Sequence, residues 1–156
     1  MKININNKIL IGIILGIILV VFTGCSLVKN KIEPERFESI YLNDGSLYGG
    51  ISYTITETSL TKTEYGNSFF DDSPAKTTTI NIDSSKLKKI KNILKKYEKN
   101  IKKWKSRYYE EIDGGSNFNF SIKDKDNNEF NMECYYGTLP EDINKFKNEM
   151  FDILND

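Results

Sequence analysis

The sequence predicts an α+β domain in which two amphipathic helices cover one face of an antiparallel sheet. Short runs with apolar side chains at alternate positions predict strands, because neighbouring side chains of a strand point to opposite faces. Closely spaced turn residues between these runs favour antiparallel pairing. Two longer segments repeat apolar residues at the 3.6-residue period of a helix. The predicted order of elements is β-β-β-β-α-β-β-α, which is typical of a two-layer domain.

Four strands are expected in the first half of the domain. Phe37 to Leu42 forms the first, and Asn43-Asp44-Gly45 is predicted to be the hairpin turn after it, because Asn or Asp before Gly favours tight turns. The second strand lies within Leu47 to Glu57, where Gly49-Gly50 indicates a bulge or a close approach of two backbones. The third and fourth strands are Leu60 to Tyr65 and Lys76 to Ile82.

Asp83, Ser84 and Ser85 offer N-cap oxygens for the first amphipathic helix, which is expected to run from there to about Trp104. Its apolar residues form one continuous stripe at helical spacing, which we expect to pack on the sheet. The stripe comprises Leu87, Ile90, Ile93, Leu94, Tyr97, Ile101 and Trp104.

A second hairpin and a second helix complete the predicted domain. Alternating apolar residues predict hairpin strands at Asn117 to Lys123 and Phe130 to Tyr136. Cys134 points the same way as the other apolar residues of its strand, so we expect a buried and unreactive thiol. Pro140 suits the first turn of the closing helix. The apolar face of that helix comprises Ile143, Phe146, Met150, Ile153 and Leu154.

The polar turn between the hairpin strands matches a calcium-binding loop only in part. Asp124, Asp126 and Asn128 have the spacing of the first three ligands of an EF-hand loop. The sixth position is Glu129 where Gly is required, and the twelfth is Tyr135 where Glu is required. We therefore expect no metal site here, and we expect no cofactor.

Composition excludes several kinds of function. The 156-residue chain has no His, which removes Ser-His-Asp catalysis, His-ligated zinc and the usual general base at neutral pH. The 22 basic and 22 acidic residues balance, so the overall charge does not predict nucleic-acid binding. We therefore expect a non-catalytic domain.

The N-terminus has the three parts of a secretory signal peptide. Lys2 and Lys8 make it positive, Ile9 to Phe22 is an unbroken apolar run of 14 residues, and small residues follow. Such a run is only about 21 Å long as a helix, whereas the hydrocarbon layer of a bilayer is about 30 Å thick. A signal-peptide helix is therefore expected before the domain, and a permanent transmembrane span is the weaker interpretation.

The end of this segment, Val21 to Cys25, resembles the lipobox of bacterial lipoproteins. Gly24 and Cys25 match the lipobox pattern. Thr23 is an acceptable small residue, and Phe22 stands where Leu is preferred. The resemblance implies cleavage between Gly24 and Cys25 and transfer of a diacylglyceryl group to the Cys25 thiol. An ordinary cleaved signal on a secreted protein is the alternative.

The resemblance also defines the expected organisation of the chain. Residues 1–24 would be the lipoprotein signal peptide, residues 25–36 the lipidated Cys and a tether, and residues 37–156 a single α+β domain. The expected location is the extracytoplasmic face of the cell membrane, with the lipid anchor as the membrane contact.

The first amphipathic helix is unusually basic. From Ser84 to Lys105 it contains ten Lys and one acidic residue, Glu98. A basic amphipathic helix is typical of contact with an anionic surface, and the alternative is a solvated face whose charge is matched by acids elsewhere in the fold. The predicted contact residues are Lys88, Lys89, Lys91, Lys95, Lys96, Lys99, Lys102 and Lys103.

The layout of the domain also resembles that of emfourin-type inhibitors of bacterial metallopeptidases. The features that carry the resemblance are Gly49-Gly50 in an early strand, the apolar-striped helix, the aromatic hairpin and the Pro-led closing helix. We expect a membrane-anchored surface lipoprotein with an accessory or binding domain. The alternatives are an inhibitor of a secreted peptidase, as the resemblance implies, and a domain that binds lipid or an anionic wall polymer through the basic helix.

Overall fold

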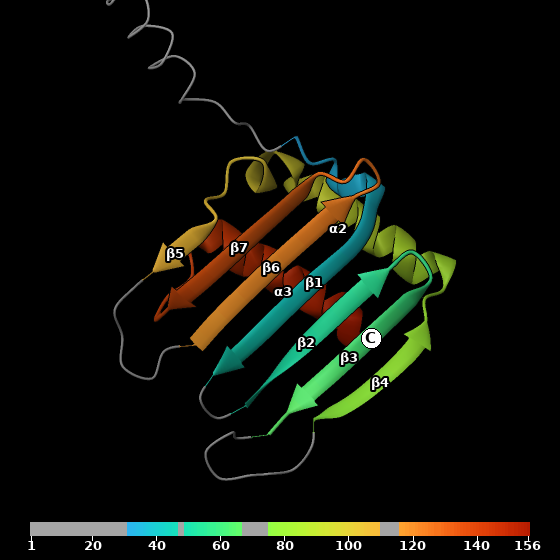
Figure 1. Cartoon of the computed structure of the whole chain (residues 1–156), viewed down its shortest axis with the longest axis horizontal. Helices are drawn as coiled ribbons and strands as arrows, with labels where there is room; N and C mark the ends of the chain where they lie inside the picture. Colours follow the sequence, from blue (N-terminus) through green and yellow to red (C-terminus); the bar gives the residue numbers. More distant parts are fainter. Residues whose placement is uncertain (1–30, 47–48, 67–74, 110–115) are drawn as a thin grey trace, which may run out of the picture.

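The computed structural model describes residues 31–46, 49–66, 75–109 and 116–156 (Figure 1). A short 3₁₀ helix, η1, opens this part of the chain, and strands and two longer helices follow. In order, the elements are η1 (Pro34–Arg36), β1 (Phe37–Ser46), β2 (Gly49–Thr56), β3 (Ser59–Tyr65), β4 (Lys76–Asn81), α2 (Ser84–Ile101), β5 (Arg107–Tyr109), β6 (Ser116–Asp124), β7 (Glu129–Tyr136) and α3 (Glu141–Asn155).

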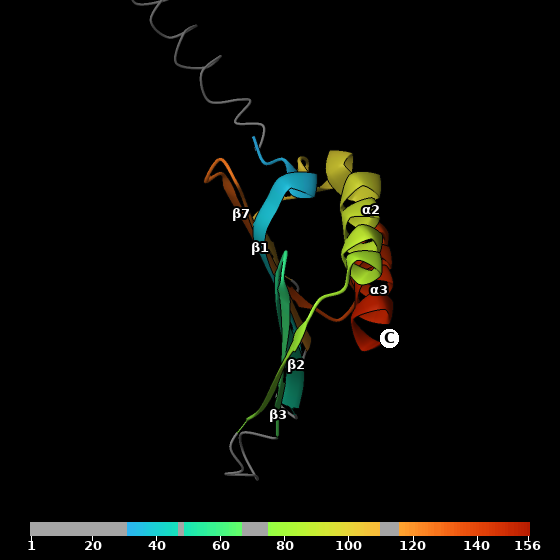
Figure 2. The same cartoon turned by 90° about the vertical axis from the view of Figure 1, so that its right-hand side faces the viewer.

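The described strands form one seven-stranded sheet in the order β4-β3-β2-β1-β6-β7-β5. Neighbouring strands are antiparallel except for β5, which runs parallel to β7. Figure 2 shows α2 and α3 side by side on one face of the sheet and leaves the other face bare. The predicted α+β class and the two covering helices are thus confirmed, and the sheet is antiparallel as predicted except at β5. The predicted signal-peptide helix lies outside the described residues.

The hydrophobic core lies between the sheet and the two helices. Phe120 and Phe146 meet at its centre, with ring centroids 5.0 Å apart in an edge-to-face arrangement. Trp104 packs against Phe146 at 5.3 Å, so the end of α2 and the sheet share one aromatic cluster. Burying one such side chain contributes about 1.5–3 kcal/mol. The buried apolar residues run from Ile32 to Leu154, so this segment contains its own core.

The helix α2 forms as its sequence predicts. The Asp83 side chain caps it by accepting a hydrogen bond from the Lys86 backbone N–H at 2.7 Å, which satisfies one of the free N–H groups of the first turn. Leu87 is partly buried against the core. The other predicted stripe residues, Ile90, Ile93, Leu94, Tyr97, Ile101 and Trp104, are buried.

The first hairpin turn is not where the sequence predicts it. β1 continues through Asn43-Asp44-Gly45 to Ser46, which pairs with Gly49. The strand continues because these residues have partners on both sides: Gly45 lies opposite Gly50 in β2 and Asn117 in β6. A Cβ added to Gly50 would lie 2.8 Å from the backbone of Asp44, which confirms the expected close approach of two backbones.

Two further features differ from the sequence-based prediction. β5 pairs with β7 through three residues only, and its own sequence carries no alternating pattern long enough to predict a strand.

The expected tether over residues 25–36 overlaps the packed structure, because Ile32 is 1% exposed and Pro34 is buried. The Glu33 backbone N–H also donates a hydrogen bond to the Asp124 carboxylate at 2.9 Å. The packed structure thus begins before the expected boundary at Phe37.

Candidate functional site

The lysines of α2 lie around the side of the helix that faces away from the sheet. Because the buried stripe occupies the inner side, the helical period divides the lysines into two groups. Those at the flanks of the helix come near acidic residues of neighbouring elements. Those opposite the stripe point directly outward. The two groups differ in how their charges are compensated.

Five of the eight predicted contact lysines form ion pairs within the fold. Lys91 pairs with Glu57 at 2.7 Å and Lys96 with Glu149 at 2.5 Å. Lys89 reaches Asp156 and Lys95 reaches Glu35, each at 3.7 Å. Lys102 pairs with Glu98 one turn earlier in α2. The alternative of a face matched by acids elsewhere in the fold therefore applies to this group.

Glu57 is the most strongly perturbed of these acids. Hydrogen bonds from the ammonium groups of Lys125 and Lys91, each at 2.7 Å, lower the pKa of Glu57 to about 2. Both bonds favour the ionised carboxylate. Glu57 follows β2, Lys91 belongs to α2 and Lys125 follows β6, so this carboxylate joins three parts of the fold.

The outward group forms a line that we call the lysine row: Lys88, Lys95, Lys99 and Lys103. Lys88, Lys95 and Lys99 lie on one side of α2, seven and then four residues apart, and Lys103 continues the line in the turn after Ile101. All four are exposed. Among the described residues, Lys88, Lys99 and Lys103 have no ion-pair partner. Lys95 is the exception in the row, because it reaches Glu35 at 3.7 Å. The charge of the predicted contact surface that remains available is therefore that of Lys88, Lys99 and Lys103.

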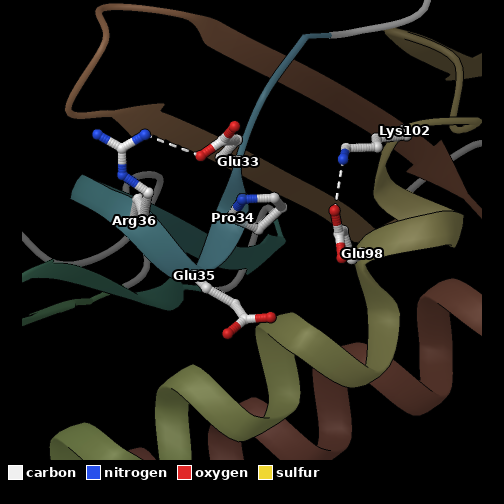
Figure 3. Close-up of a pocket in the computed structure, with 6 residues that line it drawn as sticks. All are labelled: Glu33, Pro34, Glu35, Arg36, Glu98 and Lys102. Atoms are coloured by element: carbon white, nitrogen blue, oxygen red, sulfur yellow. Dashed lines mark hydrogen bonds and ion pairs between the residues drawn. The ribbon is translucent and has the colours of Figure 1, made fainter.

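A small hollow lies between η1 and the end of α2 (Figure 3). It is lined by Glu33, Pro34, Glu35, Arg36, Glu98 and Lys102. Arg36 bonds Glu33 and Asp126, each at 2.9 Å, and Lys102 pairs with Glu98. Most of the charges around the hollow thus compensate one another, so the lysine row offers more free charge to a ligand.

Asp124, the first residue of the partial match to an EF-hand loop, is surrounded by hydrogen-bond donors. Its carboxylate accepts bonds from the backbone N–H groups of Glu33, Asp126 and Asn128, all at 2.9 Å. Burial raises the pKa of this group, but the bonds from Asn128 and the backbone outweigh burial and lower its pKa overall. Asp124 therefore fastens η1 to the turn between β6 and β7. Among the residues that the structure describes, no cluster of acids, Cys or His could hold a metal ion.

The remaining predicted site residues have different outcomes. Cys134 is buried, as expected, and burial raises the pKa of its thiol to about 11. Gly24 and Cys25 lie outside the described residues, so the lipidation site stays a prediction. Within the described ranges, no helix has the length and hydropathy needed to cross a bilayer. A hollow around Tyr41 on the bare sheet face was not predicted, because the residues that line it come together only through the pairing of the strands.

No family model matches the chain, and no significant match was found among curated proteins or among solved structures. The resemblances to bacterial lipoproteins and to emfourin-type inhibitors therefore stay predictions from the sequence.

Proposed function

We propose that the protein is a membrane-anchored surface lipoprotein with a non-catalytic binding domain, and that the lysine row contacts the anionic leaflet beside the anchor. The observation that carries the proposal is the lysine row itself. It gathers exposed positive charge on one side of α2, opposite the stripe that packs on the core.

The proposed contact is electrostatic and superficial. The apolar residues of α2 are already buried in the domain, so the helix has no apolar face free to insert between lipid chains. A Lys near an anionic leaflet contributes about 1 kcal/mol, and the attraction fades over about 8–10 Å at physiological salt. Four such residues orient the domain, while two acyl chains on Cys25 would supply stable anchoring.

The length of the tether agrees with this orientation. Six residues separate Cys25 from Ile32, and they span at most about 20 Å when extended. The chain enters the fold at η1, which lines the same hollow as Glu98 and Lys102 near the end of α2 (Figure 3). A lipid on Cys25 would therefore hold Lys99 and Lys103, at this end of the helix, close to the headgroups.

The anchor is tested by metabolic labelling of the full chain with a fatty acid in bacteria. We expect label on the native protein and none on Cys25→Ala, because the acylated thiol is then missing. Label that persists in Cys25→Ala would contradict the anchor. Mass spectrometry of the native N-terminus provides an independent measurement of cleavage before Cys25.

The surface contact is tested on residues 26–156, which contain the whole described core. We expect sedimentation with phosphatidylglycerol vesicles at about 50 mM salt and loss of binding at about 500 mM, since salt screens exposed charges. The variant with the four residues of the lysine row changed to Gln should lose this binding. The matched control changes Lys62, Lys76, Lys123 and Lys145 to Gln, which removes the same charge elsewhere.

Equal binding by the lysine-row variant and by the matched control would contradict the contact while leaving the anchor untouched. A parallel measurement with soluble polyphosphate distinguishes a lipid headgroup from an anionic polymer as the source of the phosphate. Tighter binding to vesicles supports the leaflet, and binding to polyphosphate alone contradicts it.

A further inference from the structure

The bare face of the sheet lies opposite α2 and α3 (Figure 2). It carries mostly uncharged side chains, and its charged residues Lys123, Glu129 and Glu133 lie on the β6 and β7 side. Buried residues such as Ile40 and Leu42 point toward the helices, so the residues between and beside them point to the bare face. Their pairing partners in neighbouring strands share that face. The central outward residues are Ser39, Tyr41, Asn43, Thr54, Thr61, Thr63, Tyr65, Thr77, Thr79, Asn117, Asn119, Ser121 and Asn131.

Several of these hydroxyl and amide groups hold one another in place. The Thr61 and Thr79 hydroxyls are hydrogen-bonded at 2.9 Å, and those of Thr63 and Thr77 at 3.2 Å. The amide of Asn43 donates to the Asn117 side-chain oxygen at 3.2 Å. Groups fixed before binding lose little freedom when a ligand arrives, which favours affinity. The Thr61–Thr79, Thr63–Thr77 and Asn43–Asn117 pairs are thus preorganised donors and acceptors on the bare face.

One aromatic ring stands in the middle of this array. Tyr41 is 38% exposed, and in the register of the sheet it lies directly between Thr54 of β2 and Ser121 of β6. A shallow hollow of about 210 Å³ surrounds it, lined also by Ser39, Lys123 and Glu129. This volume is below the roughly 300–1,000 Å³ of pockets that enclose a small molecule. The hollow therefore suits one unit of a longer chain that lies across the face.

Two charged residues, Lys123 and Glu129, lie at the rim of the hollow. Lys123 pairs with Glu38 at 2.6 Å, and Glu129 accepts a hydrogen bond from the Asn131 amide at 3.1 Å. The Lys123 charge is thus compensated, whereas the neutral Asn131 amide leaves the Glu129 charge in place. The hollow presents an aromatic ring and hydroxyls to a ligand, beside this one carboxylate. The lysine row, on the opposite side of the domain, is the better surface for binding a polyanion.

We propose that the bare sheet face binds a neutral glycan chain, with the Tyr41 hollow as one sugar subsite. A sugar has an apolar face that can stack on a tyrosine ring and hydroxyls that can bond to Ser39, Thr54 and Ser121. A protein partner fits less well, because the centre of a protein interface is rich in apolar and aromatic side chains. A neutral partner complements a face whose central groups are uncharged. This inference is independent of the lipid anchor and of the lysine row.

The test is a calorimetric and NMR titration of residues 26–156 with two neutral probes, the tetramers of N-acetylglucosamine and of glucose, and with polyphosphate. We expect at least one neutral tetramer to bind and to shift the amide resonances of β1, β2 and β6 around Tyr41. Tyr41→Ala should weaken binding about tenfold, because the stacking ring is lost. Ile80→Ala is the control, since Ile80 is 48% exposed but lies opposite the core residue Leu60 and so faces the helix side.

Thr54→Val keeps the shape of the hollow and removes one hydroxyl, so it serves as the test if Tyr41→Ala fails to fold. We expect it to weaken binding about threefold or more, in line with the loss of one hydrogen bond. Failure of both neutral tetramers to bind the native domain would overturn the proposal. So would equal weakening by Ile80→Ala, or resonance shifts confined to α2.

Discussion

The outer surface of α2 and the bare sheet face lie on opposite sides of one core, and they differ in how their polar groups are partnered. Lysines at the flanks of α2 meet acids of neighbouring elements, as Lys91 and Lys96 do, but most of the lysine row, at the centre, meets none among the described residues. On the sheet, uncharged side chains find partners on the next strand, as Thr61 and Thr79 do. The position of a residue in the fold thus decides which groups remain available to a ligand.

The largest effect on the free energy of unfolding is expected from truncating a side chain by which α2 packs on the core. Leu94 is fully buried in α2, so Leu94→Ala should lower the free energy of unfolding by about 3 kcal/mol, the transfer term plus a cavity. Thr61→Val, on the bare face, should change it by less than about 0.5 kcal/mol. Urea unfolding measures both. Similar losses in the two variants would contradict the assignment of one buried and one bare face.

A smaller effect is expected from the acid that compensates the flank of α2. The pKa of Glu57 is about 2, below its ordinary value of 4.5, so its contribution to stability is present above pH 4.5 and is lost as the pH falls toward 2. Because Glu57 is about a third exposed, we expect this contribution to stay below about 1 kcal/mol. Glu57→Gln should remove that part of the acid dependence, measured by urea unfolding between neutral pH and about pH 2.

The same variant also tests how an acid at the flank of α2 controls the charge of the outer surface of this helix. Glu57→Gln releases Lys91 from its ion pair, so the outer surface of α2 becomes more positive and vesicle binding at low salt should rise. Asp152→Asn is the control, because it removes one exposed negative charge from α3 without touching Lys91. An unchanged pH dependence in Glu57→Gln would contradict the role given to the Glu57 cluster.

Local patterns predicted much of this fold. The stripe of α2 and the alternation in β6 and β7 depend on short spacings, and the structure has them where they were expected. What failed depends on partners far along the chain. Asn43-Asp44-Gly45 is extended because β6 pairs beside it, and β5 exists through its pairing with β7.

The candidate site shows the same limit. The sequence identified the basic helix, but it could not separate the paired lysines from the rest, because their partners Glu57 and Glu149 lie after β2 and in α3. The Tyr41 hollow was missed altogether, since it depends on the register of β2 and β6 against β1.

The central place of β1 has a consequence for the order in which the chain can acquire its structure. Ile40 lies opposite Ile55 on one side and opposite Ile122 on the other. One edge of β1 therefore has no partner until β6 has been synthesised. Pairings of such long sequence separation slow folding. A product that stops before Ser116 would expose an unpaired edge of β1, which is a template for aggregation. Synthesis must therefore reach the last third of the chain before the sheet can close its centre.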